Sequence, residues 1–76
     1  MEPELSDNAK LILRWLQNYR FNEWVTYRGA GNRDTSFRRL LAENNLDSDD
    51  RDDAMFELFS AGKIEKSSDE RSIRLK

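Results

Sequence analysis

Apolar side chains recur near the start of the chain at the spacing of an amphipathic helix. Four of them are spaced i, i+3, i+4 and i+7 and so share one helix face: Ile12, Trp15, Leu16 and Tyr19. Ser6 precedes this run, and its side-chain oxygen can accept a hydrogen bond from an early backbone N–H. The pattern therefore predicts a first helix from about Asp7 to Tyr19.

The next segment favours a strand and then a loop. Residues from Phe21 to Tyr27 alternate loosely between apolar and polar side chains and are rich in aromatic and β-branched types, which suit strands. Residues 28–33 contain two glycines and an asparagine, which tolerate a positive φ. We expect a short strand over residues 21–27, followed by a loop.

A second, short helix is predicted after this loop. Its apolar face is formed by Phe37, Leu40 and Leu41. Asp34 or Thr35 can cap its first turn. Asn44 and Asn45 can end it, because asparagine tolerates a left-handed backbone conformation.

A third helix follows closely. Asp47 or Ser48 can cap its start, and Gly62 can end it. Its apolar face is formed by Ala54, Met55, Leu58 and Phe59. Phe56 lies off this stripe, so its side chain is expected to point away from the centre of the apolar face.

The remaining residues predict a β-hairpin. A strand begins at Ile64, residues 66–71 are polar and turn-like, and residues 72–76 alternate between polar and apolar side chains. The whole chain thus has the order helix, strand, helix, helix, strand, strand. This order predicts an α+β fold with three helices and a small three-stranded antiparallel sheet.

Composition limits both the size of the fold and the chemistry available to it. The chain has 76 residues, of which 37% are apolar and 37% charged, as suits one small domain over residues 1–76. That domain is either a whole protein or one part of a larger protein. The chain has neither Cys nor His, so it lacks thiolate nucleophiles, the usual zinc ligands and the commonest general base. We expect no enzymatic activity, no cofactor, no metal and no small-molecule substrate.

Hydropathy gives no sign of a targeting or membrane segment. The first four residues are acidic and are not followed by an apolar run, and no stretch approaches the roughly 20 apolar residues of a membrane helix. We expect a soluble chain in the cytoplasm or elsewhere inside the cell, with no membrane partner.

Charge is distributed unevenly although the formal net charge is only −2. Counting Lys and Arg against Asp and Glu gives +3 for residues 20–39, −6 for residues 40–59 and +2 for residues 60–76. A low net charge argues against indiscriminate nucleic-acid binding. The basic residues therefore flank an acidic stretch whose densest part runs from Asp47 to Asp53.

The element order and one segment of the third helix resemble the winged helix-turn-helix superfamily. The segment places apolar residues and a glycine at the positions that the superfamily uses to lead its third helix into the first wing strand: Ala54, Met55, Leu58, Gly62 and Ile64. The resemblance covers about Asp7 to Lys76. It implies a winged-helix fold, with the hairpin before Leu75 as the wing, and it implies DNA binding with the third helix in the major groove. The acids Asp49, Asp50, Asp52 and Asp53 depart from this pattern, because polar and basic residues are expected there.

The acidic run has two interpretations. Carboxylates in a first helical turn gain roughly 0.3–1 kcal/mol each from the helix dipole, and Asp47 or Ser48 can satisfy orphan amides, so capping explains part of the run. The excess of acids instead indicates a basic protein partner or a surface kept away from nucleic acid. A calcium-binding EF-hand loop does not fit, because Arg51, Asp52 and Leu58 stand where it needs an oxygen ligand, a glycine and a carboxylate.

Basic residues form two candidate phosphate sites. One is the loop and second-helix start, with Arg28, Arg33, Arg38 and Arg39, since helix N-termini and arginine forks both suit phosphate oxygens. The other is the pair that flanks the hairpin turn, Lys66 and Arg71. The alternative for both sets is solvated surface charge: pairing with the acids of the third helix in the first case, and solubility and edge protection in the second.

Aromatic residues also have two interpretations. Phe56 is either an exposed interface anchor beside acidic residues or a side chain folded back onto Trp24 or the wing. Four further aromatics could stack on bases, but in so small a chain we expect them in the core: Trp15, Tyr19, Trp24 and Tyr27.

Two functional hypotheses follow. The first is a non-enzymatic winged-helix module that binds DNA through the loop, the second-helix N-terminus and the wing, with the contacts Arg28, Arg33, Arg38, Arg39, Lys66 and Arg71. The second is a protein-interaction module that binds a basic partner through the acidic third helix, with the contacts Asp49, Asp50, Asp52, Asp53, Phe56 and Glu57. The superfamily resemblance puts DNA binding first.

Overall fold

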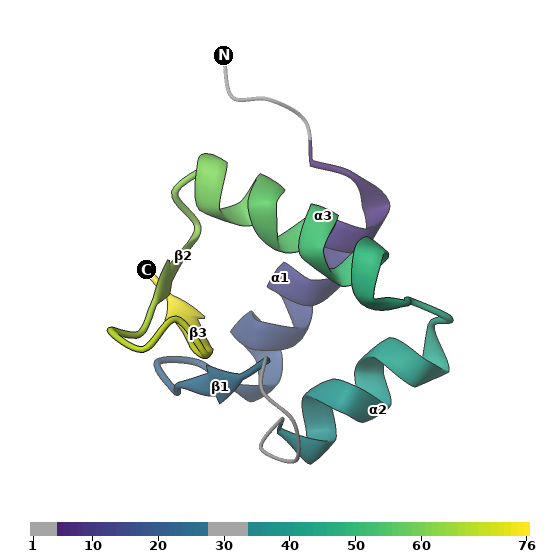
Figure 1. Cartoon of the computed structure of the whole chain (residues 1–76), viewed down its shortest axis with the longest axis horizontal. Helices are drawn as coiled ribbons and strands as arrows, with labels where there is room; N and C mark the ends of the chain where they lie inside the picture. The colour runs from purple at the N-terminus through teal and green to yellow at the C-terminus, as the bar shows by residue number, and fades with distance from the viewer. Residues whose placement is uncertain (1–4, 28–33) are drawn as a thin grey trace.

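The computed structural model describes residues 5–27 and 34–76. Three helices and three strands follow one another in the predicted order: α1 (Asp7–Tyr19), β1 (Val25–Thr26), α2 (Thr35–Glu43), α3 (Ser48–Ser60), β2 (Ile64–Lys66) and β3 (Ser72–Leu75) (Figure 1). The strands form one antiparallel sheet in the order β1-β3-β2. This is the α+β, winged-helix-like arrangement that the sequence predicted. In the part of the chain that the structure describes, no helix is long and apolar enough to cross a membrane.

Helix α1 forms over the predicted residues, but its buried face is shorter than predicted. Ser6 is its N-cap and accepts a hydrogen bond from the Ala9 amide at 3.2 Å. Ile12 and Leu16 are fully buried, whereas Tyr19 is 72% exposed, so the expectation that Tyr19 lies in the core was wrong. Tyr19 is the last residue of the helix, and the chain turns directly after it, so its ring lies at the surface, where it lines a groove with Trp15 and Leu40.

Strand β1 has only two residues, far fewer than the segment expected from Phe21 to Tyr27. The backbone turns at Phe21 and Asn22, and Asn22 has a φ of 60°. The Glu23 amide donates to the Arg20 carbonyl at 3.2 Å, which closes this turn. Asparagine tolerates this left-handed conformation, and extended pairing can begin only after the turn is complete.

Helix α2 is capped by Asp34, which confirms one of the two predicted alternatives, Asp34 or Thr35. Its Oδ1 accepts from the amides of Ser36 at 2.9 Å and Phe37 at 3.2 Å, and Arg20 binds Oδ2 at 2.7 Å. At the other end the helix stops at Glu43, and Asn45 takes a φ of 56°, as the asparagine pair predicted. The predicted loop over residues 28–33 lies outside the described residues.

We expect the cap at Asp34 to make stability depend on acidic pH. Burial raises the pKa of Asp34, but the hydrogen bond from Arg20, and after it the Phe37 amide bond, outweigh burial and leave this pKa below its ordinary value. The charged form is therefore stabilised by folding, and this contribution is present at neutral pH and lost as pH falls below about 3.9 towards the folded-state pKa. Urea midpoints should show that Asp34→Asn is less stable than wild type at pH 7 and that the difference narrows by pH 2.5. A constant difference across this range would contradict the assignment.

Helix α3 leads through a glycine into the hairpin. Gly62 has a φ of 71°, which favours glycine, and the Lys63 amide bonds the Leu58 carbonyl at 3.0 Å. In the hairpin, Ile64 pairs with Leu75 and Lys66 with Ile73. On the other side of β3, Val25 pairs with Ile73.

The core lies where α1, α3 and the sheet meet. Figure 1 shows α3 crossing the first half of α1, with the sheet beside the second half and α2 on the side away from β2. Every element contributes buried apolar residues: Ala9, Ile12, Leu16, Val25, Tyr27, Phe37, Leu41, Ala54, Met55, Leu58, Ile64, Ile73 and Leu75. Phe59, predicted as part of the apolar face of α3, is only partly buried.

Candidate functional site

The start of the acidic run caps helix α3. Asp47 is the N-cap, and its carboxylate accepts from the Asp50 amide at 2.8 Å while the Asp50 carboxylate accepts from the Asp47 amide at 3.2 Å. This reciprocal pair is a capping box, which satisfies two amides that a helix start would otherwise leave without partners. The capping interpretation is therefore confirmed for these two acids. Asp50 is also half-buried, unlike the other acids of the run, so we do not retain it as a partner contact.

The middle of the run contains a buried arginine that the sequence analysis missed. Arg51 is only 9% exposed; its Nη1 donates to the Tyr27 carbonyl at 3.3 Å, and its Nε and Nη2 donate to Asp52 Oδ1 at 3.1 and 3.0 Å. The spacing held a signal, since Arg51 precedes Ala54, Met55 and Leu58 on the apolar face by three, four and seven positions. This arginine ties α3 to the end of β1 and holds the Asp52 carboxylate in place.

Glu57 is also engaged within the fold. Its carboxylate accepts from both the backbone amide and the hydroxyl of Ser6, the residue that caps α1. The hydrogen bond from the Ser6 hydroxyl makes the largest contribution to lowering the pKa of Glu57 below its ordinary value, and the bond from the Ser6 amide makes the next largest. Because both carboxylate oxygens bind Ser6, we do not retain Glu57 as a partner contact.

Four of the predicted residues remain on the outward side of α3. Asp49, Asp52 and Asp53 precede Phe56 by seven, four and three positions, so all four share one helix face. All are exposed, and Phe56 is exposed to 71% and does not fold back onto Trp24 or the hairpin. Within the described residues, no hydrogen bond or ion pair engages the carboxylates of Asp49 and Asp53. We call this set, Asp49, Asp52, Asp53 and Phe56, the α3 outer face.

A small pocket borders the α3 outer face where α3 meets β2. Its volume is about 210 Å³, and it is lined by Tyr27, Asp52, Met55, Phe56, Phe59 and Lys66. The ammonium of Lys66 lies 4.9 Å from the centre of the Phe59 ring. We call this site the α3–β2 pocket.

The predicted basic residues do not converge on one site in the described structure. Arg28 and Arg33 lie outside the described residues. Arg38 and Arg39 are both exposed on α2, but Arg38 borders a pocket against the start of α3, whereas Arg39 lines a groove against α1 with Trp15 and Tyr19. The side chains of the adjacent residues therefore face different neighbours.

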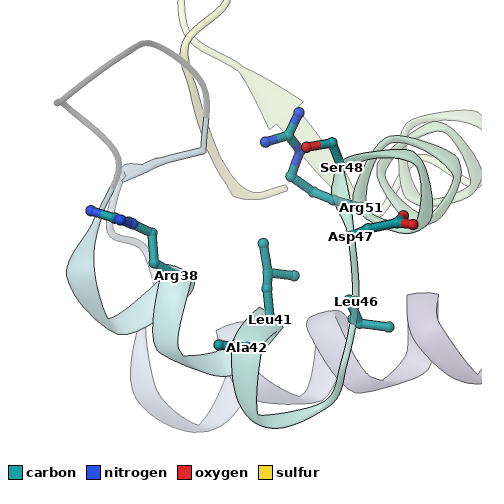
Figure 2. A pocket seen from close by; sticks show the side chains of 7 residues that line it. All are labelled: Arg38, Leu41, Ala42, Leu46, Asp47, Ser48 and Arg51. Atoms are coloured by element: carbon teal, nitrogen blue, oxygen red, sulfur yellow. The ribbon is translucent and has the colours of Figure 1, made fainter.

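Figure 2 shows the pocket between α2 and α3, which has a volume of about 360 Å³. Arg38 and Arg51 both line it, but Leu41 lies between them and the guanidinium of Arg38 extends away from that of Arg51. Arg51 is already bound to Asp52 and to the Tyr27 carbonyl. The two arginines therefore do not form a phosphate fork in this arrangement.

The hairpin leaves both of its predicted cations at the surface. Lys66 is exposed and stacks on Phe59, as described above, while Arg71 is exposed beyond the turn. The turn itself is stabilised by Asp69, whose carboxylate accepts from the Ser67 hydroxyl and from the Arg71 amide. The hydrogen bond from the Ser67 hydroxyl is the largest cause that lowers the pKa of Asp69 below its ordinary value, and the bond from the Arg71 amide is the second.

Two of the four aromatics predicted for the core are exposed at the surface instead. Tyr27 is 4% exposed and Trp15 packs at the edge of the core, as expected, but Tyr19 is largely exposed and Trp24 is 42% exposed. Trp24 stacks instead under the guanidinium of Arg74, 4.4 Å from the ring centre. Phe21, at the turn before β1, is also exposed. No cluster of acidic residues able to hold a metal ion exists in residues 5–27 and 34–76.

Comparisons of the chain with protein-family models, with curated proteins and with solved structures give no match. The function of this chain is therefore inferred from its own geometry. That geometry puts an exposed aromatic ring and three exposed carboxylates on one face of α3.

Proposed function

We propose that this chain is a non-enzymatic interaction module that binds a positively charged protein surface through the α3 outer face. The observation that carries the proposal is the 71% exposure of Phe56 on a helix face that also presents Asp49, Asp52 and Asp53. Aromatic residues are favoured anchors at protein interfaces, and complementary charges around them raise association rates and specificity.

The charge of α3 also argues against a recognition helix that enters a DNA groove. Phosphates attract Lys and Arg and repel carboxylates. Two acids of the run are used in the capping box, but Asp49, Asp52 and Asp53 remain on the exposed face. Electrostatic repulsion would therefore weaken the binding of a DNA duplex to this face, whereas electrostatic attraction would strengthen the binding of a basic protein surface.

A capture experiment tests this proposal. The purified chain is immobilised and exposed to a nuclease-treated extract of its source cells, beside the variants Phe56→Ala and Asp53→Lys. We expect wild type to retain a basic protein partner and Phe56→Ala to weaken its binding at least about tenfold, as for an interface anchor. Asp53→Lys should also weaken binding, because it adds charge repulsion with the basic partner. This loss should be larger at low salt than at high salt, because salt screens the repulsion.

Matched controls are available elsewhere on the chain. Tyr19→Ala removes an aromatic side chain of similar exposure from the end of α1, and Glu43→Lys makes the same charge reversal at the end of α2. Both controls should bind as wild type does. The proposal fails if no protein is retained, or if the variants and their controls bind equally.

DNA contact is the second candidate, favoured by one observation. Arg38 and Arg39 are both exposed on α2 and form no ion pair with any described residue. Together with Arg71 of the hairpin, which is also exposed, they are available to hold phosphates. A titration with random duplex DNA at two salt concentrations decides the point: salt-sensitive binding that is lost in the double variant Arg38→Glu, Arg39→Glu would favour DNA over a protein partner.

A further inference from the structure

The α3–β2 pocket has dimensions that suit one side chain. Its volume of about 210 Å³ lies below the roughly 300–1,000 Å³ of small-molecule sites. Met55, Phe56 and Phe59 give it apolar and aromatic walls, and Asp52 is the acidic residue in its lining. An occupant therefore needs both an apolar stem and a positive charge.

A cation already occupies part of this site. The Lys66 ammonium lies 4.9 Å from the Phe59 ring centre, within the roughly 6 Å range of a cation–π interaction. Lys66 is exposed, and it comes from β2 rather than from α3. Because its long side chain can move into solvent at little cost, it can be displaced by a better cation.

The Asp52 carboxylate is held in position for such a cation. Arg51, which is anchored on the Tyr27 carbonyl, donates twice to Oδ1 of Asp52. The second oxygen, Oδ2, makes no hydrogen bond within the described residues. It is therefore free to accept from a group that enters the pocket.

We propose that the α3–β2 pocket receives an arginine side chain from the basic protein partner, which deepens and depends on the function proposed above. The arginine stem packs on Met55 and Phe56, its guanidinium replaces Lys66 over the Phe59 ring, and one N–H donates to Asp52 Oδ2. Arginine suits the site better than lysine, because its planar guanidinium is less strongly hydrated and stacks on aromatic faces. Lys66 is then an internal competitor.

A peptide titration tests the pocket without the natural partner. The probes are three end-blocked tripeptides, Gly-X-Gly, in which X is arginine, lysine or citrulline. Two-dimensional NMR spectra follow the ring protons of Phe59 and the methyl group of Met55. We expect saturable shifts at these groups that are tightest for arginine, weaker for lysine and weakest for citrulline, which keeps the shape of arginine without its charge.

Variants of the chain give the sharper result. Lys66→Ala should tighten binding of the arginine peptide about two- to fivefold, because it removes the internal cation–π contact. Lys76→Ala makes the same charge change at an exposed residue that does not line the pocket, so it should have a smaller effect. Asp52→Asn and Phe59→Leu should each weaken binding at least about twofold. Circular dichroism spectra establish that each variant is folded.

Three outcomes would overturn the inference. In the first, the shifts do not localise to the pocket or citrulline binds as well as arginine. In the second, Lys66→Ala weakens binding, or tightens it no more than Lys76→Ala does. In the third, Lys66→Ala weakens duplex DNA binding, or self-association depends on Asp52 and Phe59, so that nucleic acid or a second copy is the occupant.

Failure of this inference is distinguishable from failure of the proposed function. A captured partner whose binding requires Phe56 but is indifferent to Phe59→Leu and Lys66→Ala would keep the interaction module and remove the arginine pocket. Loss of any captured partner would remove both the module and the source of the arginine.

Discussion

Replacing Phe37 with alanine will leave a large fraction of the molecules unfolded at room temperature. Phe37 is fully buried, and its ring packs against Trp15 with 5.7 Å between ring centres. Removal of a buried phenylalanine side chain costs about 3–5 kcal/mol. A single core in a domain of this size supplies about the same amount, roughly 3–5 kcal/mol, so little stability is left.

Circular dichroism during thermal and urea unfolding checks this expectation. The matched control is Phe21→Ala, which removes the same side chain from an exposed position at the turn before β1. We expect the control to stay within about 0.5 kcal/mol of wild type, as for other surface substitutions. Equal stability of the two variants would show that α2 is not packed against α1 as described.

Arg51→Ala will destabilise the fold by about 2–3 kcal/mol, because it removes the hydrogen bonds that Arg51 donates to the charged Asp52. The substitution removes the link between the Tyr27 carbonyl and Asp52, and it exposes the apolar surface that the arginine stem covers. The carbonyl of Tyr27 would also lose this donor. Urea unfolding at neutral pH measures the loss.

Two further variants separate the charge of Arg51 from its bulk. Arg51→Met keeps the apolar stem, so it should recover part of the lost stability but not the hydrogen bonds. Arg38→Ala removes an exposed arginine that borders the same pocket and should change stability by no more than about 0.5 kcal/mol. If Arg38→Ala costs as much as Arg51→Ala, the buried network does not have the role given to it here.

Most of the fold could be predicted because local chemistry marks its boundaries. Ser6, Asp34 and Asp47 cap the three helices, and Asn45 and Gly62 adopt the positive φ that ends two of them. These are interactions between residues close in sequence, so a pattern along the chain contains them. Strand β1 was predicted too long because the turn at Asn22 interrupts an otherwise strand-like composition.

The candidate site was harder to predict because it depends on contacts between distant residues. Helical spacing places Arg51 on the apolar face of α3, but its partner, the carbonyl of Tyr27, is 24 residues away in the chain. Ser6, the partner of Glu57, is 51 residues away. No local pattern in the sequence predicts either of these pairings. The exposure of Phe56 was one of two alternatives, since spacing alone places its side chain off the core but does not say whether another element covers it.

The acidic run therefore divides into parts with different tasks. Asp47 and Asp50 close the start of α3, and Asp52 is held by Arg51. Asp49 and Asp53 are left for solvent or a partner. Seven consecutive residues that look uniform in sequence thus serve helix formation, tertiary structure and surface charge, because successive positions on a helix point in different directions.

The strand order β1-β3-β2 has a consequence for the motions of the molecule. Among the strands of the described residues, the two outer ones each pair with β3 alone, so each loses its partner strand if β3 detaches. Backbone amides in β1 and β2 would then become open to solvent in the same event, although they lie far apart in the chain. The sheet should open as one cooperative unit, and hydrogen exchange in its two edges should follow a common free energy.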